Sequence, residues 1–205
     1  MSPTDAPPPR ARVAEARRNR QNLIAVATRV FASSGQKRVP LEEIAKEAGV
    51  GIGTLYRHFP TREALVEAVY RDQVDRLRVG ARELLATHPP ARALRLWMDL
   101  FADWAATKHG MIDTLRAIIS SGRLEFDHMR AELVAVVRMF LDAGARAGDI
   151  RPDADAEAVA GTLAGILSVA GAHDQRDQAS RMLSLLMDGL RPSGGATPQA
   201  SVLMR

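Results

Sequence analysis

One short stretch, residues 41–59, holds the side chains with the clearest potential chemistry, LEEIAKEAGVGIGTLYRHF. Its second half offers four polar side chains that could donate hydrogen bonds to phosphate oxygens or to base edges. They are Thr54, Tyr56, Arg57 and His58. Leu55 and Phe59 lie four residues apart, so a helix here would bury these two side chains and turn the polar ones outward.

The residues before this polar group predict a first short helix and a tight turn. Apolar side chains recur at i, i+3, i+4 and i+7 over residues 41–48, which indicates a helix of about two turns. Gly49 follows directly, where a helix often ends in a left-handed conformation. Two helices joined in this way can form a helix-turn-helix, whose second helix enters a DNA major groove. The same spacing also fits a purely structural bundle.

The charge distribution favours DNA binding. Residues 1–60 contain ten Lys or Arg against five Asp or Glu, a net charge of +5, whereas residues 61–205 contain eighteen against nineteen. The basic excess therefore lies beside the predicted helix-turn-helix, where it can attract phosphates. Arg17 and Arg18 could lie along the DNA backbone, although a solubilising tail explains the same arginine-rich segment.

The composition limits the other classes of protein. The chain of 205 residues is 46% hydrophobic but only 4% aromatic, which favours a globular, all-α fold. The absence of cysteine excludes disulfides, thiolate metal sites and a cysteine nucleophile. The N-terminal residues lack the apolar core of a secretory signal, and no apolar run reaches the ~20 residues that a spanning helix requires. We expect a soluble, cytoplasmic protein with no membrane partner.

Periodicity and helix breakers predict about nine helices. Residues 1–11, with four of the eleven prolines, are expected to be a disordered lead. Besides the two short helices, we expect helices over about 14–34, 61–86, 91–107, 111–119, 125–147, 155–172 and 178–190. The predicted organisation is a DNA-binding segment over 1–60, a regulatory and dimerisation segment over 61–191 and a disordered tail over 192–205.

The motif GVGIGTLYRHFPTREAL, which follows a helix containing VFASSG, resembles the DNA-binding domain of the TetR family of transcriptional repressors. The resemblance covers about residues 20–70. A second stretch, WMDLFADWAATKHG, resembles the start of the ligand domain in an actinobacterial-type branch of that family, with matches at Trp97, Thr107, Lys108 and Gly110. Val39 departs from the family pattern, which often has there a Thr or Ser that caps the helix and touches a phosphate.

The resemblance implies two kinds of DNA contact. Tyr56, His58, Thr61 and Arg62 would mostly touch phosphates, while residues 51–54 and Arg57 would lie nearer the base edges. Including the arginine-rich segment, the predicted DNA-binding residues are Arg17, Arg18, Lys46, Gly51, Ile52, Gly53, Thr54, Tyr56, Arg57, His58, Thr61 and Arg62.

The regulatory segment concentrates its largest side chains, including both tryptophans, in three neighbouring helices. Large side chains beside small ones favour a shaped cavity, although ordinary core packing explains the same pattern. Polar groups from Lys108, His109, Arg116 or His128 could orient a ligand there. The predicted pocket residues are Trp97, Phe101, Trp104, Lys108, Met111, Leu115, Ile118, Phe126 and Met129.

Gly161 and Gly165 lie four residues apart, which lets another helix approach closely, either within one subunit or across a dimer. The resemblance implies that the last two helices pair in a four-helix interface, so we favour the homodimer. The predicted interface residues are Gly161, Leu163, Gly165, Ile166, Leu167, Met182, Leu185 and Leu186.

No sequence motif supports catalysis. No two histidines fall three or four residues apart, and neither a phosphate-binding glycine loop nor a Gly-x-Ser-x-Gly motif is found. We therefore expect no metal and no cofactor. The sequence favours a homodimeric repressor that binds a palindromic operator and is released by a small hydrophobic ligand. The alternative is a helical enzyme or small-molecule-binding protein whose helix-turn-helix is only structural.

Overall fold

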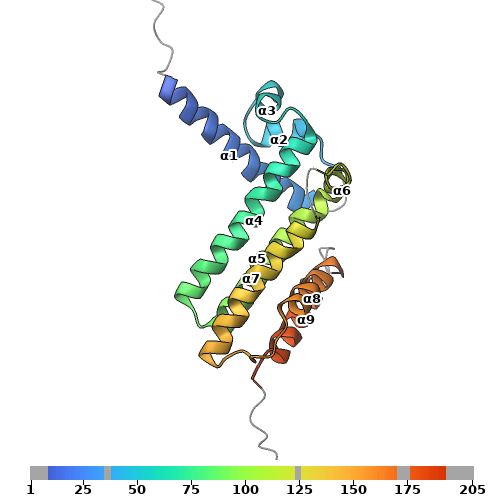
Figure 1. Cartoon of the computed structure of the whole chain (residues 1–205). Coiled ribbons are helices and arrows are strands. Elements are labelled where there is room, and N and C mark those ends of the chain that lie inside the picture. Colours follow the sequence, from blue (N-terminus) through green and yellow to red (C-terminus); the bar gives the residue numbers. More distant parts are fainter. Residues whose placement is uncertain (1–8, 35–37, 123–125, 170–175, 193–205) are drawn as a thin grey trace, which may run out of the picture.

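The computed structural model describes residues 9–34, 38–122, 126–169 and 176–192. These ranges contain nine α-helices and no strand (Figure 1). The helices are α1 (Pro9–Ser34), α2 (Leu41–Glu47), α3 (Ile52–His58), α4 (Arg62–Thr87), α5 (Pro90–Gly110), α6 (Ile112–Ser120), α7 (Phe126–Ala147), α8 (Ala156–Val169) and α9 (Arg176–Gly189). None of these helices is long and apolar enough to cross a membrane.

The helices form two connected groups along the molecule. In Figure 1, α1, α2 and α3 lie at one end, and α4, α5 and α7 run away from them, with α8 and α9 beside α7. Because α4 is a single helix of 26 residues, it joins the two groups without a flexible linker. The predicted all-α class with about nine helices is confirmed.

Two helix boundaries differ from the sequence prediction. The first helix begins at Pro9, inside the segment expected to be disordered, because proline lacks only an N–H that the first turn does not use. The fifth helix continues past residue 107 to Gly110. At the start of α4, Thr61 caps the helix as its sequence position predicts, and its Oγ1 accepts a hydrogen bond from the Ala64 N–H at 3.2 Å. The predicted tail over 193–205 lies outside the described residues.

Buried side chains form two cores. The N-terminal core joins α1, α2 and α3 to the first half of α4 and to α6. The C-terminal core joins the second half of α4 to α5, α7, α8 and α9. Trp104 on α5 packs against both cores. The N-terminal core therefore extends well beyond residue 60, and one aromatic side chain touches both groups of helices.

Candidate DNA-binding surface and ligand cavity

The turn between α2 and α3 is built from local backbone geometry. Gly49 has φ of +70°, a conformation that other residues rarely adopt. The N–H of Gly49 donates to the Lys46 carbonyl at 3.1 Å, and the N–H of Val50 donates to the Ala45 carbonyl at 3.0 Å, which closes the end of α2. Gly51 then caps α3, and its carbonyl accepts from the Thr54 N–H at 2.8 Å.

The helix α3 has one buried and one exposed face. Leu55 and the following Phe59 are buried in the N-terminal core, as their spacing predicts. Tyr56 is 44% exposed and Ile52 is 37% exposed. The other residues predicted on this surface are exposed or partly exposed: Lys46, Gly51, Gly53, Thr54, Arg57, His58 and Thr61. The exposed face of α3 thus carries large and polar side chains, while Leu55 and the following Phe59 hold the helix against the core.

Arg57 lies along the outer surface of α3. Its Nε donates to the Gly53 carbonyl at 3.2 Å, and its Nη2 lies 3.5 Å from the Thr54 hydroxyl oxygen. Both contacts are exposed, so the guanidinium can exchange them for phosphate or base acceptors.

The helix α1 supports this surface in a way that the sequence analysis missed. The Asn22 amide donates to the Ala48 carbonyl in the turn at 2.9 Å. The Arg20 guanidinium lies 5.0 Å from the ring centroid of Phe59, within cation–π range. Arg17 and Arg18 are exposed on the same helix, three and two residues before Arg20. The signal for Arg20 and Asn22 was their position just before the buried residues of α1.

Arg62, one of the predicted DNA contacts, has its guanidinium directed into the protein. Its Nε donates to the Thr114 hydroxyl oxygen of α6 at 3.1 Å, and its Nη1 donates to the Val39 carbonyl. The same guanidinium lies 5.6 Å from the ring centroid of Phe31. Burial lowers the pKa of Arg62, and repulsion from Arg38 adds to the effect. Arg62 therefore links α1, the connection before α2, and α6.

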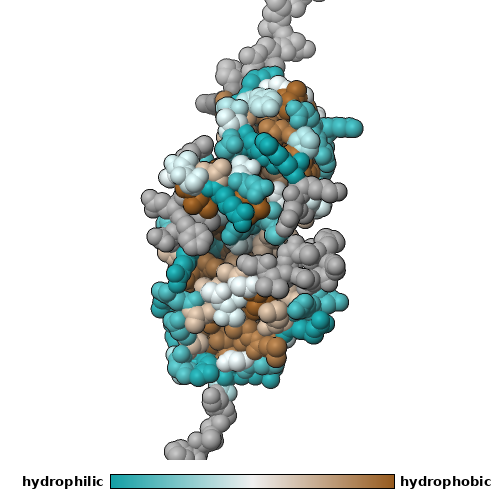
Figure 2. All heavy atoms as spheres, turned by 90° about the vertical axis from the view of Figure 1, so that its right-hand side faces the viewer, coloured by the Kyte–Doolittle hydropathy of each residue, from teal (hydrophilic) through white to brown (hydrophobic). Residues whose placement is uncertain are grey.

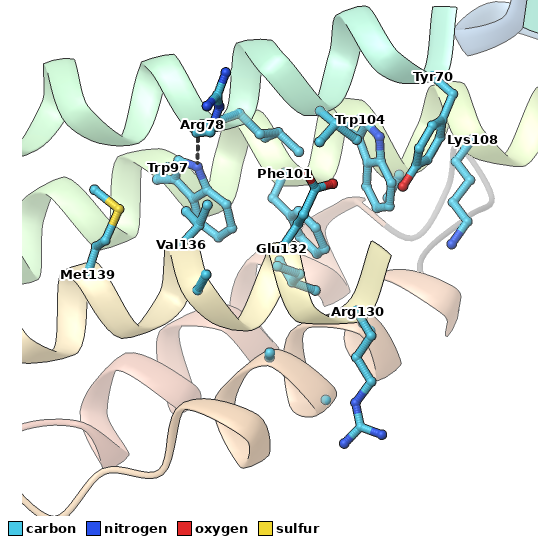
Figure 3. Close-up of a pocket in the computed structure, with 18 of the residues that line it drawn as sticks. Tyr70, Arg78, Trp97, Phe101, Trp104, Lys108, Arg130, Glu132, Val136 and Met139 are labelled. Carbon is cyan, nitrogen blue, oxygen red and sulfur yellow. Dashed lines mark hydrogen bonds between the residues drawn. The ribbon is translucent and has the colours of Figure 1, made fainter. Parts of the chain in front are cut away.

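A cavity of about 580 Å³ lies between α4, α5, α7 and α8. Its volume falls within the range of small-molecule sites. Four of the predicted pocket residues line it: Trp97, Phe101, Trp104 and Lys108. Figure 3 shows the rings of Trp97, Phe101 and Trp104 in a row, with Tyr70 and Lys108 at one end of the row and Met139 at the other. The sequence analysis missed the walls from the other helices, which include Tyr70, Val74 and Leu77 of α4, Leu133, Val136 and Met139 of α7, and Ala160, Gly161 and Ala164 of α8.

The aromatic side chains of α5 are stacked. The ring centroids of Trp97 and Phe101 are 5.3 Å apart, and those of Phe101 and Trp104 are 5.0 Å apart. Trp97 and Phe101 are almost fully covered and form the floor of the cavity, whereas Trp104 is partly exposed. The Trp97 Nε1–H donates to the Leu77 carbonyl at 2.9 Å, which fixes this floor to α4.

Three predicted pocket residues lie elsewhere. Met111, Leu115 and Ile118 are buried in the N-terminal core instead of the cavity wall. The helix breaks at Met111, which has φ of −124° and ψ of 12°, and α6 therefore turns its apolar face toward α1 and α4. The side chains of Phe126 and Met129 lie outside the described residues. Of the possible polar groups, His109 and Arg116 line the cavity, whereas His128 is exposed and faces Glu132.

The predicted dimer residues divide between core and surface. Leu163 and Ile166 are 0% and 5% exposed in a single subunit, so they belong to its core and not to an interface, which corrects their assignment. Gly161 and Gly165 are exposed, and no atom lies within 4 Å of where a Cβ would stand. Leu185 is 71% exposed, while Met182 and Leu186 are partly buried. The side chain of Leu167 lies outside the described residues.

Comparison with known proteins identifies the family. The family model for bacterial regulatory proteins of the tetR family matches residues 23–69, and a model for the C-terminal domain of SbtR-like transcriptional regulators matches residues 89–192. The second match alone covers half of the chain. The chain belongs to the TetR family. It is therefore a transcriptional regulator by family, and the family resemblance predicted from the motif in residues 41–59 is confirmed.

Known TetR-family proteins resemble the chain over most of its length. The crystal structure of the TetR regulator SCO0520 from Streptomyces coelicolor superposes with a TM-score of 0.76 over 85% of this chain and 99% of that one, with 48% sequence identity. A TetR regulator from Mycobacterium vanbaalenii is 36% identical, with a TM-score of 0.67, over 87% and 98%. The transcriptional repressor KstR2 of Mycolicibacterium smegmatis is 31% identical over 68% of this chain and 71% of its own length.

The cavity of this TetR-family chain has a polar end. Burial lowers the pKa of Lys108, whose ammonium lies 5.0 Å from the Trp104 ring centroid. Burial also raises the pKa of Tyr70, and the negative charge of Glu132 raises it further. The Trp104 Nε1–H is buried without a hydrogen-bond partner among the described residues. Among all the residues that the structure describes, no group of three or more His, Asp or Glu side chains could hold a metal ion.

Proposed function

We propose that this TetR-family regulator is a homodimeric repressor that binds an inverted-repeat operator and releases it when a small hydrophobic ligand fills the cavity. The observation that carries the proposal is the division of α3. Its buried Leu55 and the adjacent Phe59 hold the helix in place, while Tyr56 and Arg57 remain available to DNA. The relatives named as repressors support repression as the regulatory outcome.

The proposed dimer would form through α8 and α9. The exposed Gly161 and Gly165 allow close approach of a second helix, and Leu185 supplies apolar surface. Figure 2 shows apolar side chains gathered over the lower half of the face that carries these helices. A specific interface typically buries ~800 Å² per partner. Two symmetric α3 helices would then read half-sites about one DNA turn, or ~34 Å, apart.

Two physical links favour coupling between cavity and DNA-binding surface. Tyr70, Val74 and Leu77 place α4 in the cavity wall, and the same helix begins in the N-terminal core. The end of α5 lies against α1, since a Cβ at Gly110 would overlap the Phe31 carbonyl. A ligand that changes the packing of α4 or α5 would therefore change the separation of the two α3 helices. Such coupling is commonly worth about 1 to 3 kcal/mol.

The first experiment selects DNA duplexes that the purified protein retains from a random pool. We expect enrichment of an inverted repeat, and binding of the selected duplex should saturate at one dimer. Binding to a scrambled duplex should be weaker at equal salt concentration. Enrichment of no sequence, or of an isolated half-site bound by a monomer, would contradict the proposed operator recognition.

A second experiment tests the dimer surface. Leu185→Glu places a charge at the exposed apolar position on α9 and should shift the protein toward monomer in sedimentation equilibrium. Arg138→Glu, on the exposed surface of α7, is the matched control and should leave the oligomeric state unchanged. An identical sedimentation behaviour of all three proteins would exclude α9 from the interface.

A further inference from the structure

We propose that the effector of this cavity is an aromatic carboxylate, with its rings beside the aromatic side chains of α5 and its carboxylate beside the ammonium of Lys108. The inference rests on the ligand response proposed above and adds the chemical class of the ligand. Its starting point is a cation in the wall of a largely apolar cavity, with no counterion among the described residues.

Lys108 differs from Arg78 and Arg130, two of the four arginines around the same cavity. Arg78 and Arg130 form ion pairs at 3.0 Å and 2.9 Å with carboxylates that do not line the cavity. Figure 3 shows the side chain of Arg130 extending away from the row of rings. The ammonium of Lys108 instead lies over the face of Trp104, and no carboxylate of the described chain reaches ion-pair distance from it.

The solvation of Lys108 is incomplete in this arrangement. A partly buried ammonium loses water, and the face of an aromatic ring replaces only part of the lost solvation. Burial accordingly lowers its pKa from the ordinary value of 10.5. A ligand carboxylate would restore a full counterion and a charge-assisted hydrogen bond in a site shielded from water.

The charge of the whole lining favours the same sign of ligand. Four arginines and Lys108 line the cavity, against one acidic residue, Glu132. Arg78, Arg116 and Arg130 are paired with carboxylates outside the lining, so the excess positive charge comes from Arg82 and Lys108. A cationic ligand would be repelled by this lining, and a neutral ligand would leave Lys108 without a partner. Only an anion removes both penalties. A single unpaired ammonium matches one carboxylate better than a phosphate, which would require several inward-facing donors.

The shape of the aromatic wall indicates the body of the ligand. Trp97, Phe101, Trp104 and Lys108 are spaced four, three and four residues apart, so they follow one face of α5 over about 16 Å. The planes of successive rings are inclined by only 18° and 23°. The rings stack on one another, so the wall is a continuous apolar strip that ends at a cation. Two or three fused rings that carry a carboxylate at one end match both its length and its chemistry.

The experiment compares 2-naphthoate with its neutral analogue 2-naphthamide in the absence of DNA. Both tryptophans of the chain line the cavity, so quenching of tryptophan fluorescence reports binding directly. We expect the full-length protein to bind the carboxylate at least about tenfold more tightly, the low end for a hydrogen bond to a charged group. Lys108→Met should abolish this preference, and Lys108→Arg should retain most of it. The control Arg138→Met, on the exposed surface of α7, should match the wild-type protein.

Three results would overturn the assignment. They are equal affinity for the two naphthalene compounds, an unchanged preference in Lys108→Met, and no quenching by either compound up to its solubility limit. Circular dichroism and operator binding show whether Lys108→Met is folded. Because the probe measurement needs no DNA, a wild-type protein that discriminates the two compounds but binds no operator would refute the proposed repressor function and leave the ligand class standing.

Discussion

Replacement of Arg62 by methionine separates its observed role inside the protein from the DNA contact expected from its sequence position. Methionine keeps a long side chain but removes both hydrogen bonds, to Thr114 and to the Val39 carbonyl, and the cation–π contact with Phe31. Each hydrogen bond of a partly exposed guanidinium contributes about 1 kcal/mol, and the ring contact adds about 0.5 to 1 kcal/mol. The free energy of unfolding should therefore fall by about 2 to 3 kcal/mol.

Urea unfolding of the full-length protein measures this loss. Thr114→Val is the matched control, because it removes one acceptor while the charge of Arg62 remains, and it should cost about 1 kcal/mol. The double variant should lose less unfolding free energy than the sum of the two single-variant losses, since both single changes remove the same hydrogen bond. Fully additive losses would show that the Arg62–Thr114 contact contributes nothing to stability.

The salt dependence of operator binding provides the second measurement. A guanidinium directed into the protein neutralises no phosphate, so the slope of log K against log salt concentration should be the same in Arg62→Met and in the wild-type protein. A phosphate contact by Arg62 would instead reduce this slope by about 1. A reduced slope together with unchanged stability would refute the inward role of Arg62.

Three further predictions concern the surface, the packing and the cavity. Tyr56→Ala should weaken binding to operator and to unrelated duplex by the same factor, about fivefold, as measured by fluorescence anisotropy; a loss confined to the operator would indicate base contact instead. Gly110→Ala should lower the free energy of unfolding by about 1 to 3 kcal/mol, because its methyl group would overlap the Phe31 carbonyl, whereas Gly189→Ala, with open space around its Cβ, should not destabilise the protein. Lys108→Met should raise the melting temperature at pH 7, where the buried charge of Lys108 destabilises the folded state. Because the folded-state pKa lies below 10.5, folded Lys108 loses its proton first as pH rises, and the gain should shrink toward pH 10.5; a gain that grows with pH would contradict this reasoning.

The parts of the site that sequence could predict are governed by local interactions. The exposed face of α3 follows from the spacing of Leu55 and Phe59, and the turn follows from the positive φ of Gly49. The aromatic wall of α5 was also readable, since its residues share one helical face. These predictions needed only distances along a single helix or turn.

The parts that sequence could not predict depend on contacts between distant segments. Arg62 stands at an exposed-looking helix start, yet its partner Thr114 is 52 residues away. Leu163 and Ile166 share a helix with the exposed Gly161, but periodicity does not reveal which apolar face meets the subunit's own core. Tyr70 likewise fits an ordinary helix stripe, and only the packing of α7 and α8 makes it part of a cavity wall.

The burial of Met111, Leu115 and Ile118 in the N-terminal core has a consequence for protein engineering. A fragment that ends at residue 60 would lack both the first half of α4 and α6, and its remaining apolar side chains would face water. Hybrid regulators that join this DNA-binding end to a foreign sensor should therefore carry α6 of this chain together with α1 and α4. A junction at Thr61 would divide the N-terminal core, whereas a junction after Ser120 keeps that core whole and requires the foreign sensor to cover the apolar faces of α4 and α5 that α7, α8 and α9 cover here.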